Sequence, residues 1–118
     1  MSLGLKDGDI YWAKELRKGM HYHQLGESDL VVSEACLGTM TWGEQNSEEE
    51  AFEQLDMAYD EFGVNFIDTA EMYPVPAKEE TQGRTEIALG KWLKKRTRHD
   101  VIVATKVRSD VCRFAGSD

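Results

Sequence analysis

Three side chains that could move a proton follow apolar segments of this sequence. The stretch FIDTAEMY, residues 66–73, begins as an apolar strand and ends in polar groups that include Asp68 and Tyr73, and Lys106 comes directly after VIVAT at 101–105. A phenol with its ordinary pKa of about 10 is a weak acid at neutral pH. A full positive charge about 4 Å away, at an effective dielectric constant of about 20, favours the phenolate by roughly 4 kcal/mol, on the order of three pKa units. We therefore predict that Lys106 activates Tyr73 as a proton donor and that Asp68 holds Lys106 ionised and oriented.

Each of these side chains also has a simpler structural interpretation. Asp68 is then the cap of a turn, Tyr73 a half-buried loop aromatic, and Lys106 a solvated charge at the end of a strand. For any one of the residues alone, the structural role is the better hypothesis. The chemical role depends on elements that bring all three to one place.

Strands and helices alternate along the predicted fold. VVSEACLG at 31–38, followed by a turn-like stretch, predicts a hairpin and a strand. A helix is expected over 47–63, with Ser47 and Glu50 as a capping box and Gly63 at its C-terminal end. Its apolar side chains recur at helical spacing: Ala51, Phe52, Leu55, Ala58, Tyr59 and Phe62.

Two further apolar segments predict strands that are covered on both faces. They are VNFID at 64–68 and VIVAT at 101–105, and a helix over 85–96 lies between them. This helix carries Ile87, Ala88, Trp92 and Leu93 at helix-like spacing, and Trp92 is expected to pack against the sheet. The order predicts an α/β fold with parallel strands and right-handed crossovers.

The carboxyl ends of parallel strands meet at one rim, where ligands and chemistry gather. The first strand delivers Gly38, Thr39, Met40 and Trp42 to that rim. The second delivers Asp68 and then Tyr73, and the third delivers Lys106. Met40 and Trp42 are equally compatible with loop packing and with pocket lining.

Composition excludes several classes of function. The chain has 118 residues, enough for about one domain, and its formal net charge of -8 disfavours nucleic acid or an anionic membrane as a partner. No apolar run reaches the roughly twenty residues of a membrane span, and residues 1–19 do not resemble a secretory signal. We expect a cytoplasmic protein.

Other residues that sometimes carry function have simpler interpretations here. Cys36 and Cys112 fit neither a metal spacing nor a CxxC pair, and His21 and His23 lack a third ligand, so no metal site is predicted. Residues 48–50 are three glutamates at the start of a helix, and KKRTRH at 94–99 reads as a solvated helix end favoured by the helix dipole.

Residues 20–107 resemble the aldo-keto reductase family. The resemblance is carried by MHYHQLGESDLVVSEACLGTMTWGEQNS, FIDTAEMYPVP, ETQGRTEIALGKWL and VIVATKV. It implies a TIM (β/α)8 barrel that transfers hydride from NADPH to aldehydes and ketones, and it uses no GxGxxG motif. The family's catalytic tetrad is Asp, Tyr, Lys and His, and the resemblance places the first three on Asp68, Tyr73 and Lys106. It also implies cofactor contacts by Gly38, Thr39, Met40, Gln45 and Asp68, and a substrate pocket with Trp42 and Tyr73.

Parts of the family pattern do not fall within these residues. The tetrad's His follows the family's fourth strand, and the cations that grip the cofactor's phosphates come from the far half of the barrel. We therefore expect an incomplete barrel, made of the N-terminal hairpin and the first three βα units. Residues 1–19 are expected to be an extension outside the family and residues 108–118 a divergent tail.

Two functions remain open. The first is NADP(H)-dependent reduction of a small-molecule carbonyl, with this chain inactive by itself. The second is a non-catalytic fragment that acts through exposed barrel strands, by self-association or by association with a full-length relative.

Overall fold

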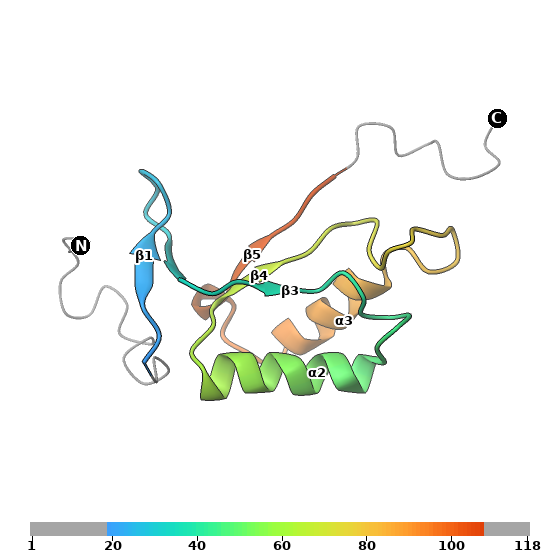
Figure 1. Ribbon diagram of the computed structural model, residues 1–118, viewed down its shortest axis with the longest axis horizontal. Coiled ribbons are helices and arrows are strands. Elements are labelled where there is room, and N and C mark those ends of the chain that lie inside the picture. Colours follow the sequence, from blue (N-terminus) through green and yellow to red (C-terminus); the bar gives the residue numbers. More distant parts are fainter. Residues whose placement is uncertain (1–18, 108–118) are drawn as a thin grey trace.

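The computed structural model describes residues 19–107 as a hairpin followed by an α/β unit (Figure 1). The expected extension up to residue 18, and the expected tail at 108–118 with Cys112, lie outside the described residues. The strands are β1 (Tyr22–Gln24), β2 (Val31–Ser33), β3 (Leu37–Gly38), β4 (Phe66–Asp68) and β5 (Ile102–Ala104). The helices are α2 (Glu48–Asp56), a π-helical turn (Met57–Glu61), α3 (Arg84–Leu93) and a 3-10 helix (Arg98–Asp100).

The strands form two sheets, as the sequence predicted. β1 and β2 pair antiparallel, with His23 opposite Val32. The second sheet has the order β3-β4-β5 and is parallel throughout. In its register Gly38 lies opposite Asp68, and Asp68 lies opposite Ala104, so the three strands end together.

The capping box of α2 is confirmed, but the helix changes character sooner than predicted. Ser47 Oγ accepts from the Glu50 N–H, and a Glu50 carboxylate oxygen accepts from the Ser47 N–H at 3.0 Å. After Asp56 the chain widens into a π-helical turn, which shifts the helical phase. Tyr59 therefore stays buried, whereas Phe62, expected on the same apolar face, is 54% exposed. Gly63 has a φ of +74°, as suits its predicted place at the helix end.

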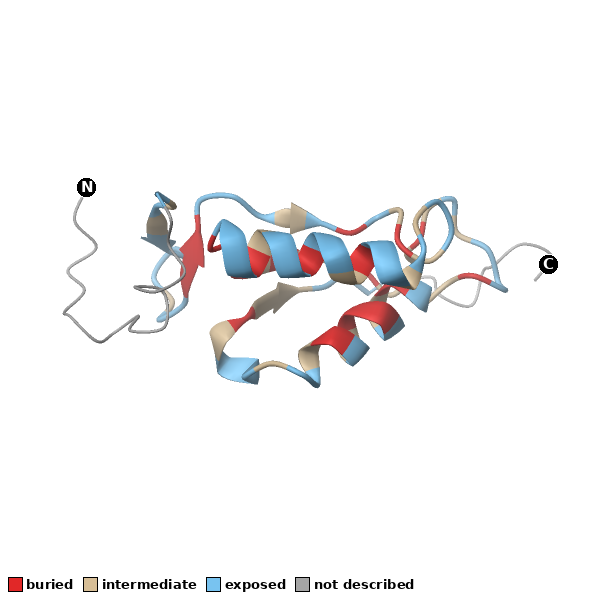
Figure 2. Ribbon diagram, turned by 90° about the horizontal axis from the view of Figure 1, so that it is seen from below, coloured by how far each residue is buried: buried red, intermediate tan, exposed pale blue. Residues whose placement is uncertain are grey.

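The hydrophobic core lies between one face of the parallel sheet and the two helices (Figure 2). The sheet contributes Leu37, Ile67, Val101 and Val103, and the helices contribute Ala51, Leu55, Tyr59, Leu89 and Trp92. Trp92 packs edge-on against Tyr59, with ring centroids 5.7 Å apart, which confirms its predicted packing role. The prediction for Ile87 was wrong, because α3 turns this side chain to solvent and leaves it 57% exposed.

The opposite face of the parallel sheet has no covering layer in the described part of the chain. Side chains alternate across a strand, so Phe66, Ile102 and Ala104 point away from the core residues. All three are only partly buried, and Figure 1 shows both helices on one side of the sheet. The prediction of strands covered on both faces was therefore wrong for residues 19–107.

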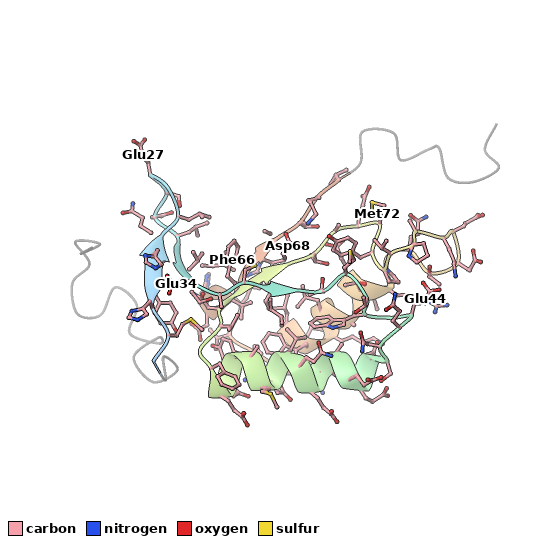
Figure 3. All side chains as sticks on the ribbon, in the orientation of Figure 1. Glu27, Glu34, Glu44, Phe66, Asp68 and Met72 are labelled. Carbon is pink, nitrogen blue, oxygen red and sulfur yellow. The ribbon has the colours of Figure 1, made fainter. Side chains whose placement is uncertain are left out.

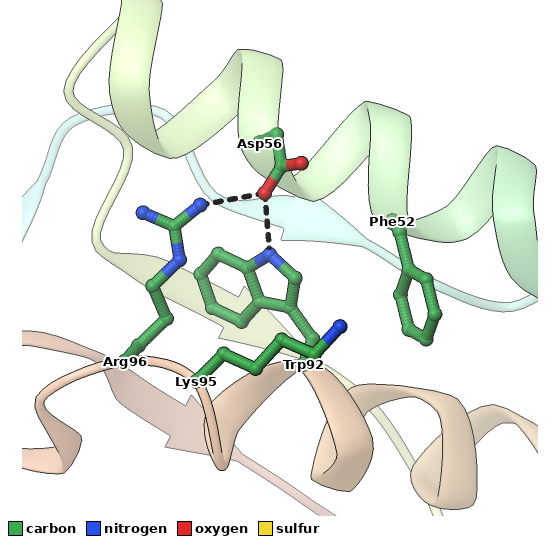
Figure 4. Close-up of a pocket in the computed structure, with 5 residues that line it drawn as sticks. All are labelled: Phe52, Asp56, Trp92, Lys95 and Arg96. Atoms are coloured by element: carbon green, nitrogen blue, oxygen red, sulfur yellow. Dashed lines mark hydrogen bonds and ion pairs between the residues drawn. The ribbon is translucent and has the colours of Figure 1, made fainter.

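Arg96 corrects the prediction that the basic run is a solvated helix end. Its guanidinium donates to Asp56 Oδ1 at 2.6 Å and to Asp60 Oδ1 at 2.7 Å. It also stacks on the Trp92 ring, 4.8 Å from the centroid, and its side chain is only 23% exposed. Hydrogen bonds from Trp92 and then Arg96 lower the pKa of Asp56. These groups line a hollow of about 320 Å³ together with Phe52 and Lys95 (Figure 4).

The phenol of Tyr59 is expected to lose its proton at a higher pH than an ordinary tyrosine. Burial, and then the charge of Asp100, raises its pKa to about 12. Because the fold favours the protonated phenol, this stabilisation is complete below the ordinary pKa of about 10 and is lost as the pH rises towards 12. The pH titration of tyrosinate absorbance is measured for the wild type and for Tyr59→Phe. The difference between the two curves should show one transition with its midpoint at about 12. A midpoint at about 10 would contradict the burial of this hydroxyl.

No helix among residues 19–107 has the length and apolar character needed to cross a bilayer.

Candidate active site

Asp68, Tyr73 and Lys106 come together at the carboxyl end of the parallel sheet. Asp68 is the last residue of β4, and Lys106 follows two residues after β5. Figure 3 shows Asp68 at the end of its strand and Met72 in the loop that follows, next to Tyr73 in the sequence. The parallel register places the two strand ends side by side, as the sequence predicted.

The ammonium of Lys106 is the centre of this group. It donates to both carboxylate oxygens of Asp68 at 2.9 Å and to the Thr69 carbonyl at 2.8 Å. It also lies over the ring of Tyr73, 5.2 Å from the centroid, in a cation–π contact. A lysine ammonium has three N–H donors, so these three acceptors match its full donor capacity.

The ion pair keeps Lys106 charged rather than stabilising the fold. The hydrogen bond that Lys106 donates to Asp68 raises the pKa of Lys106, with smaller effects from the charges of Asp68 and Tyr73. The Lys106 and Asp68 side chains are 53% and 41% exposed, and solvent screens such pairs so that they add little to stability. The pair therefore maintains a cation beside a phenol at neutral pH.

Backbone hydrogen bonds fix the loop that carries Tyr73. The Tyr73 N–H donates to the Ala70 carbonyl at 3.1 Å, and the Tyr73 carbonyl accepts from the Gly83 N–H at 2.9 Å. Two residues later, the Val75 N–H donates to the Met40 carbonyl at 3.0 Å. The loop after β3 and the start of α3 thus hold this segment from two sides.

The residues after β3 that were predicted to contact a cofactor differ in how exposed they are. Thr39 is buried, and its hydroxyl donates to the Asp68 carbonyl at 2.8 Å, so its side chain supports Asp68. Gly38, Met40 and Gln45 are exposed. The cofactor contacts of Gly38, Thr39, Met40, Gln45 and Asp68 stay predictions. Gln45 lies in a separate hollow of about 430 Å³ between this loop and α3.

Trp42 packs in the core, one of the two interpretations that the sequence left open, and its predicted contact with the substrate stays a prediction. Its side chain is 1% exposed and belongs to the core between the helices and the sheet. The indole N–H donates to the Gln54 side chain at 3.0 Å, and the Trp42 carbonyl accepts from the Thr85 hydroxyl at 2.6 Å. The loop after β3 folds this ring inward, because α2 and α3 offer it both an apolar site and a polar partner.

Cys36 was not predicted near the site, yet the charges of Asp68 and Lys106 both affect the pKa of its thiol. Partial burial raises the pKa of the thiol and the negative charge of Asp68 adds to the rise, whereas Lys106 and an Asp68 backbone hydrogen bond oppose it. Alternation along the strand could have suggested this position, since Cys36 lies two residues before Gly38, which pairs with Asp68.

Gly43 is required for the close approach between this loop and α3. Its φ is +99°, and an added Cβ would lie 2.6 Å from the Arg84 Cβ. We expect Gly43→Ala to lower the free energy of unfolding by about 2–5 kcal/mol, from left-handed strain and overpacking together. Urea unfolding of the 118-residue chain measures this loss. Gly83→Ala is the control, because Gly83 also has a positive φ of +87° but open space around it. Equal losses for both variants would contradict the packing contribution.

Comparisons with known proteins agree with one another. A sequence profile described as "Aldo/keto reductase family" matches residues 34–117. The chain is 55% identical over 89 residues to "Protein tas" of Escherichia coli (strain K12), a match that covers 75% of this chain and 25% of that protein. It is 41% identical over 90 residues to "Uncharacterized oxidoreductase YrpG" of Bacillus subtilis (strain 168), covering 75% and 26%.

Solved structures share the fold of the described region. The "aldo-keto reductase AKR11C1 from Bacillus halodurans (holo form)" superposes with a TM-score of 0.61 at 43% sequence identity, covering 75% of this chain and 26% of that one. The chain thus spans about a quarter of the length of the relatives that it matches.

Proposed function

The chain belongs to the aldo/keto reductase family, and on that premise we propose that Asp68, Tyr73 and Lys106 form the proton-delivery group of an NADPH-dependent carbonyl reductase. The observation that supports the proposal most directly is the position of the Lys106 ammonium. It is bound to both oxygens of Asp68 and lies over the ring of Tyr73. The substrate class is an aldehyde or ketone.

The residues at the rim fit the reacting end of such a cofactor. Gly38 lies directly opposite Asp68 in the sheet, and an added Cβ at Gly38 would meet no atom within 4 Å. A flat ring can therefore approach the carboxyl end of β3 without a side chain in its way. The family resemblance places the cations that bind the cofactor's phosphates in the far half of the barrel, outside the region that this chain matches.

The bound cofactor would supply hydride to the carbonyl carbon. Tyr73 donates its hydroxyl proton to the carbonyl oxygen as negative charge develops there. The Lys106 ammonium stabilises the phenolate that remains, and Asp68 keeps Lys106 protonated and aligned.

A chimera tests this function. Residues 34–107 of this chain replace the matching segment of the Bacillus halodurans reductase, and NADPH consumption is followed with an aldehyde present. The proposal predicts aldehyde-dependent oxidation by the chimera and none by the 118-residue chain alone. A folded chimera that binds NADPH but does not oxidise it with any of a panel of aldehydes and ketones would overturn the proposal.

A further inference from the structure

The strand end that carries Lys106 is held from the helical side of the sheet. Val103 packs into the core, so alternation along the chain places Thr105 on the helical side and Lys106 on the opposite side. The Thr105 hydroxyl donates to Glu86 Oε2 at 2.6 Å. Glu86 lies in the first turn of α3. A helix side chain therefore binds the residue that directly precedes Lys106.

This hydrogen bond adds to two backbone bonds from the segment after β4. The Thr69 N–H donates to the Ala104 carbonyl at 2.8 Å, and the Glu71 N–H donates to the Lys106 carbonyl at 3.2 Å. The Thr69 side chain gives no further support, because its buried hydroxyl has no hydrogen-bond partner in the described part of the chain. The strand end is thus held by its backbone along one edge and by the Thr105 side chain from the helices.

The ion pair by itself is a weak anchor for this strand end. The Lys106 and Asp68 side chains are 53% and 41% exposed, and solvent screens pairs of this kind. The Thr105 bond differs, because its acceptor is a carboxylate and its length of 2.6 Å is typical of a charge-assisted O–H···O bond. A displacement of about 1 Å can cost a catalytic group about 10²-fold in rate. The position of Lys106 therefore depends on what holds its backbone.

We propose that Glu86 is a positioning residue for Lys106. Its carboxylate holds Thr105 from the helical side, and this contact keeps the ammonium of the next residue against Asp68 and over the Tyr73 ring. The effect on the strand end depends on the hydrogen bond alone, whereas the effect on catalysis rests on the proposed function. A purely local role for Glu86, as a favourable charge at the start of α3, would leave Lys106 unaffected.

Hydrogen exchange in the 118-residue chain tests the effect on the strand end. Glu86→Ala should speed exchange of the Glu71 amide, which is bonded to the Lys106 carbonyl, by about five- to tenfold. The Ile102 amide donates to the Asn65 carbonyl at 2.7 Å at the other end of β5, and it should exchange at the wild-type rate. Equal acceleration of both amides, or no acceleration at Glu71, would overturn the proposal.

Three further variants make the exchange measurement specific. Thr105→Val removes the hydroxyl and keeps the branched shape, so it should match Glu86→Ala and replaces it if that variant does not fold. Glu86→Gln keeps an acceptor oxygen and should restore most of the protection. Protection as low as in Glu86→Ala would assign the effect to charge and contradict the proposal. Glu48→Ala is the matched control, because Glu48 lies in the first turn of α2 and accepts from Lys91 of the other helix at 3.0 Å, and it should leave Glu71 exchange unchanged.

Kinetics of the chimera test the effect on catalysis. Glu86→Ala and Thr105→Val should each lower kcat about 10–10²-fold with an unchanged KM for NADPH, since they misplace a reacting group and not the cofactor. The double variant should lose no more than the more damaging single variant, because both changes break the same hydrogen bond. Losses that add up would mean that the two residues act separately, and the proposal would be wrong.

The positioning role and the proposed function fail in different ways. A wild-type chimera that folds but is inactive counts against the proposed function alone, and the exchange rates then decide the role of Glu86. An active wild-type chimera whose kcat is unchanged by Glu86→Ala overturns the positioning role alone.

Discussion

Tyr73→Phe in the chimera is expected to lower kcat for aldehyde reduction by about 10²–10⁴-fold, the usual contribution of a positioned general acid. The change removes the phenol hydroxyl and leaves an aromatic ring for the cation–π contact with Lys106 at 5.2 Å. The Asp68–Lys106 hydrogen bonds do not involve Tyr73 and should persist. Steady-state kinetics with NADPH and a simple aldehyde measure the loss.

Tyr59→Phe is the matched control for that experiment. Its hydroxyl lies on the helical side of the sheet, 3.5 Å from Asp100, and takes no part in the rim. Binding of NADPH, measured by fluorescence titration, should be the same in both variants, since a proton donor acts on the bound carbonyl. If Tyr73→Phe retained more than a tenth of kcat, another group would be the acid and the proposed role of Tyr73 would be lost.

The meeting of Asp68 and Lys106 at one edge of the sheet could be predicted from the sequence, because it depends only on the order and direction of the strands. Two short apolar strands joined by amphipathic helices imply parallel pairing, and parallel pairing brings strand ends to one edge. Asp68 ends one such strand and Lys106 lies two residues beyond the next, so their meeting needs no knowledge of side-chain packing. Their roles in catalysis are still predictions, because the geometry brings the groups together without testing the reaction.

Features that depend on contacts between helices could not be predicted in the same way. Arg96 looks like part of a solvated basic run, yet its carboxylate partners lie 36 and 40 residues earlier, on the neighbouring helix and its π-helical turn. Trp42 lies in a turn-like stretch that suits a pocket wall, and only the approach of α2 and α3 makes it a core residue. Local spacing carries no information about such pairings.

The uncovered face of the parallel sheet is a second feature that the sequence did not predict. VNFID and VIVAT have the composition of strands covered on both faces. The described residues cover these strands on one face only. The strands therefore have a more apolar composition than their burial within residues 19–107 accounts for.

Asn65 is a buried polar residue that the sequence analysis did not single out. It is 0% exposed, and it joins the hairpin to the start of β4. Its side-chain oxygen accepts from the Ser33 N–H at 2.6 Å, and its amide nitrogen donates to the Val31 carbonyl at 2.9 Å. These bonds satisfy the free edge of β2, which pairs with β1 on its other side.

Asn65→Ala should lower the free energy of unfolding by about 2–6 kcal/mol, because it leaves two buried backbone groups unpaired at about 1–3 kcal/mol each. A typical domain has only about 5–15 kcal/mol in total, so the upper part of that range would unfold the chain. Urea unfolding followed by circular dichroism gives the loss, and hydrogen exchange at the Ser33 amide reports whether the hairpin detaches first. Gln24→Ala is the control, since it removes an exposed amide-to-carbonyl bond of 2.7 Å to Ser28 that water can replace. A loss for Asn65→Ala no larger than that of the control would mean that water reaches this edge and that the hairpin is not held by Asn65.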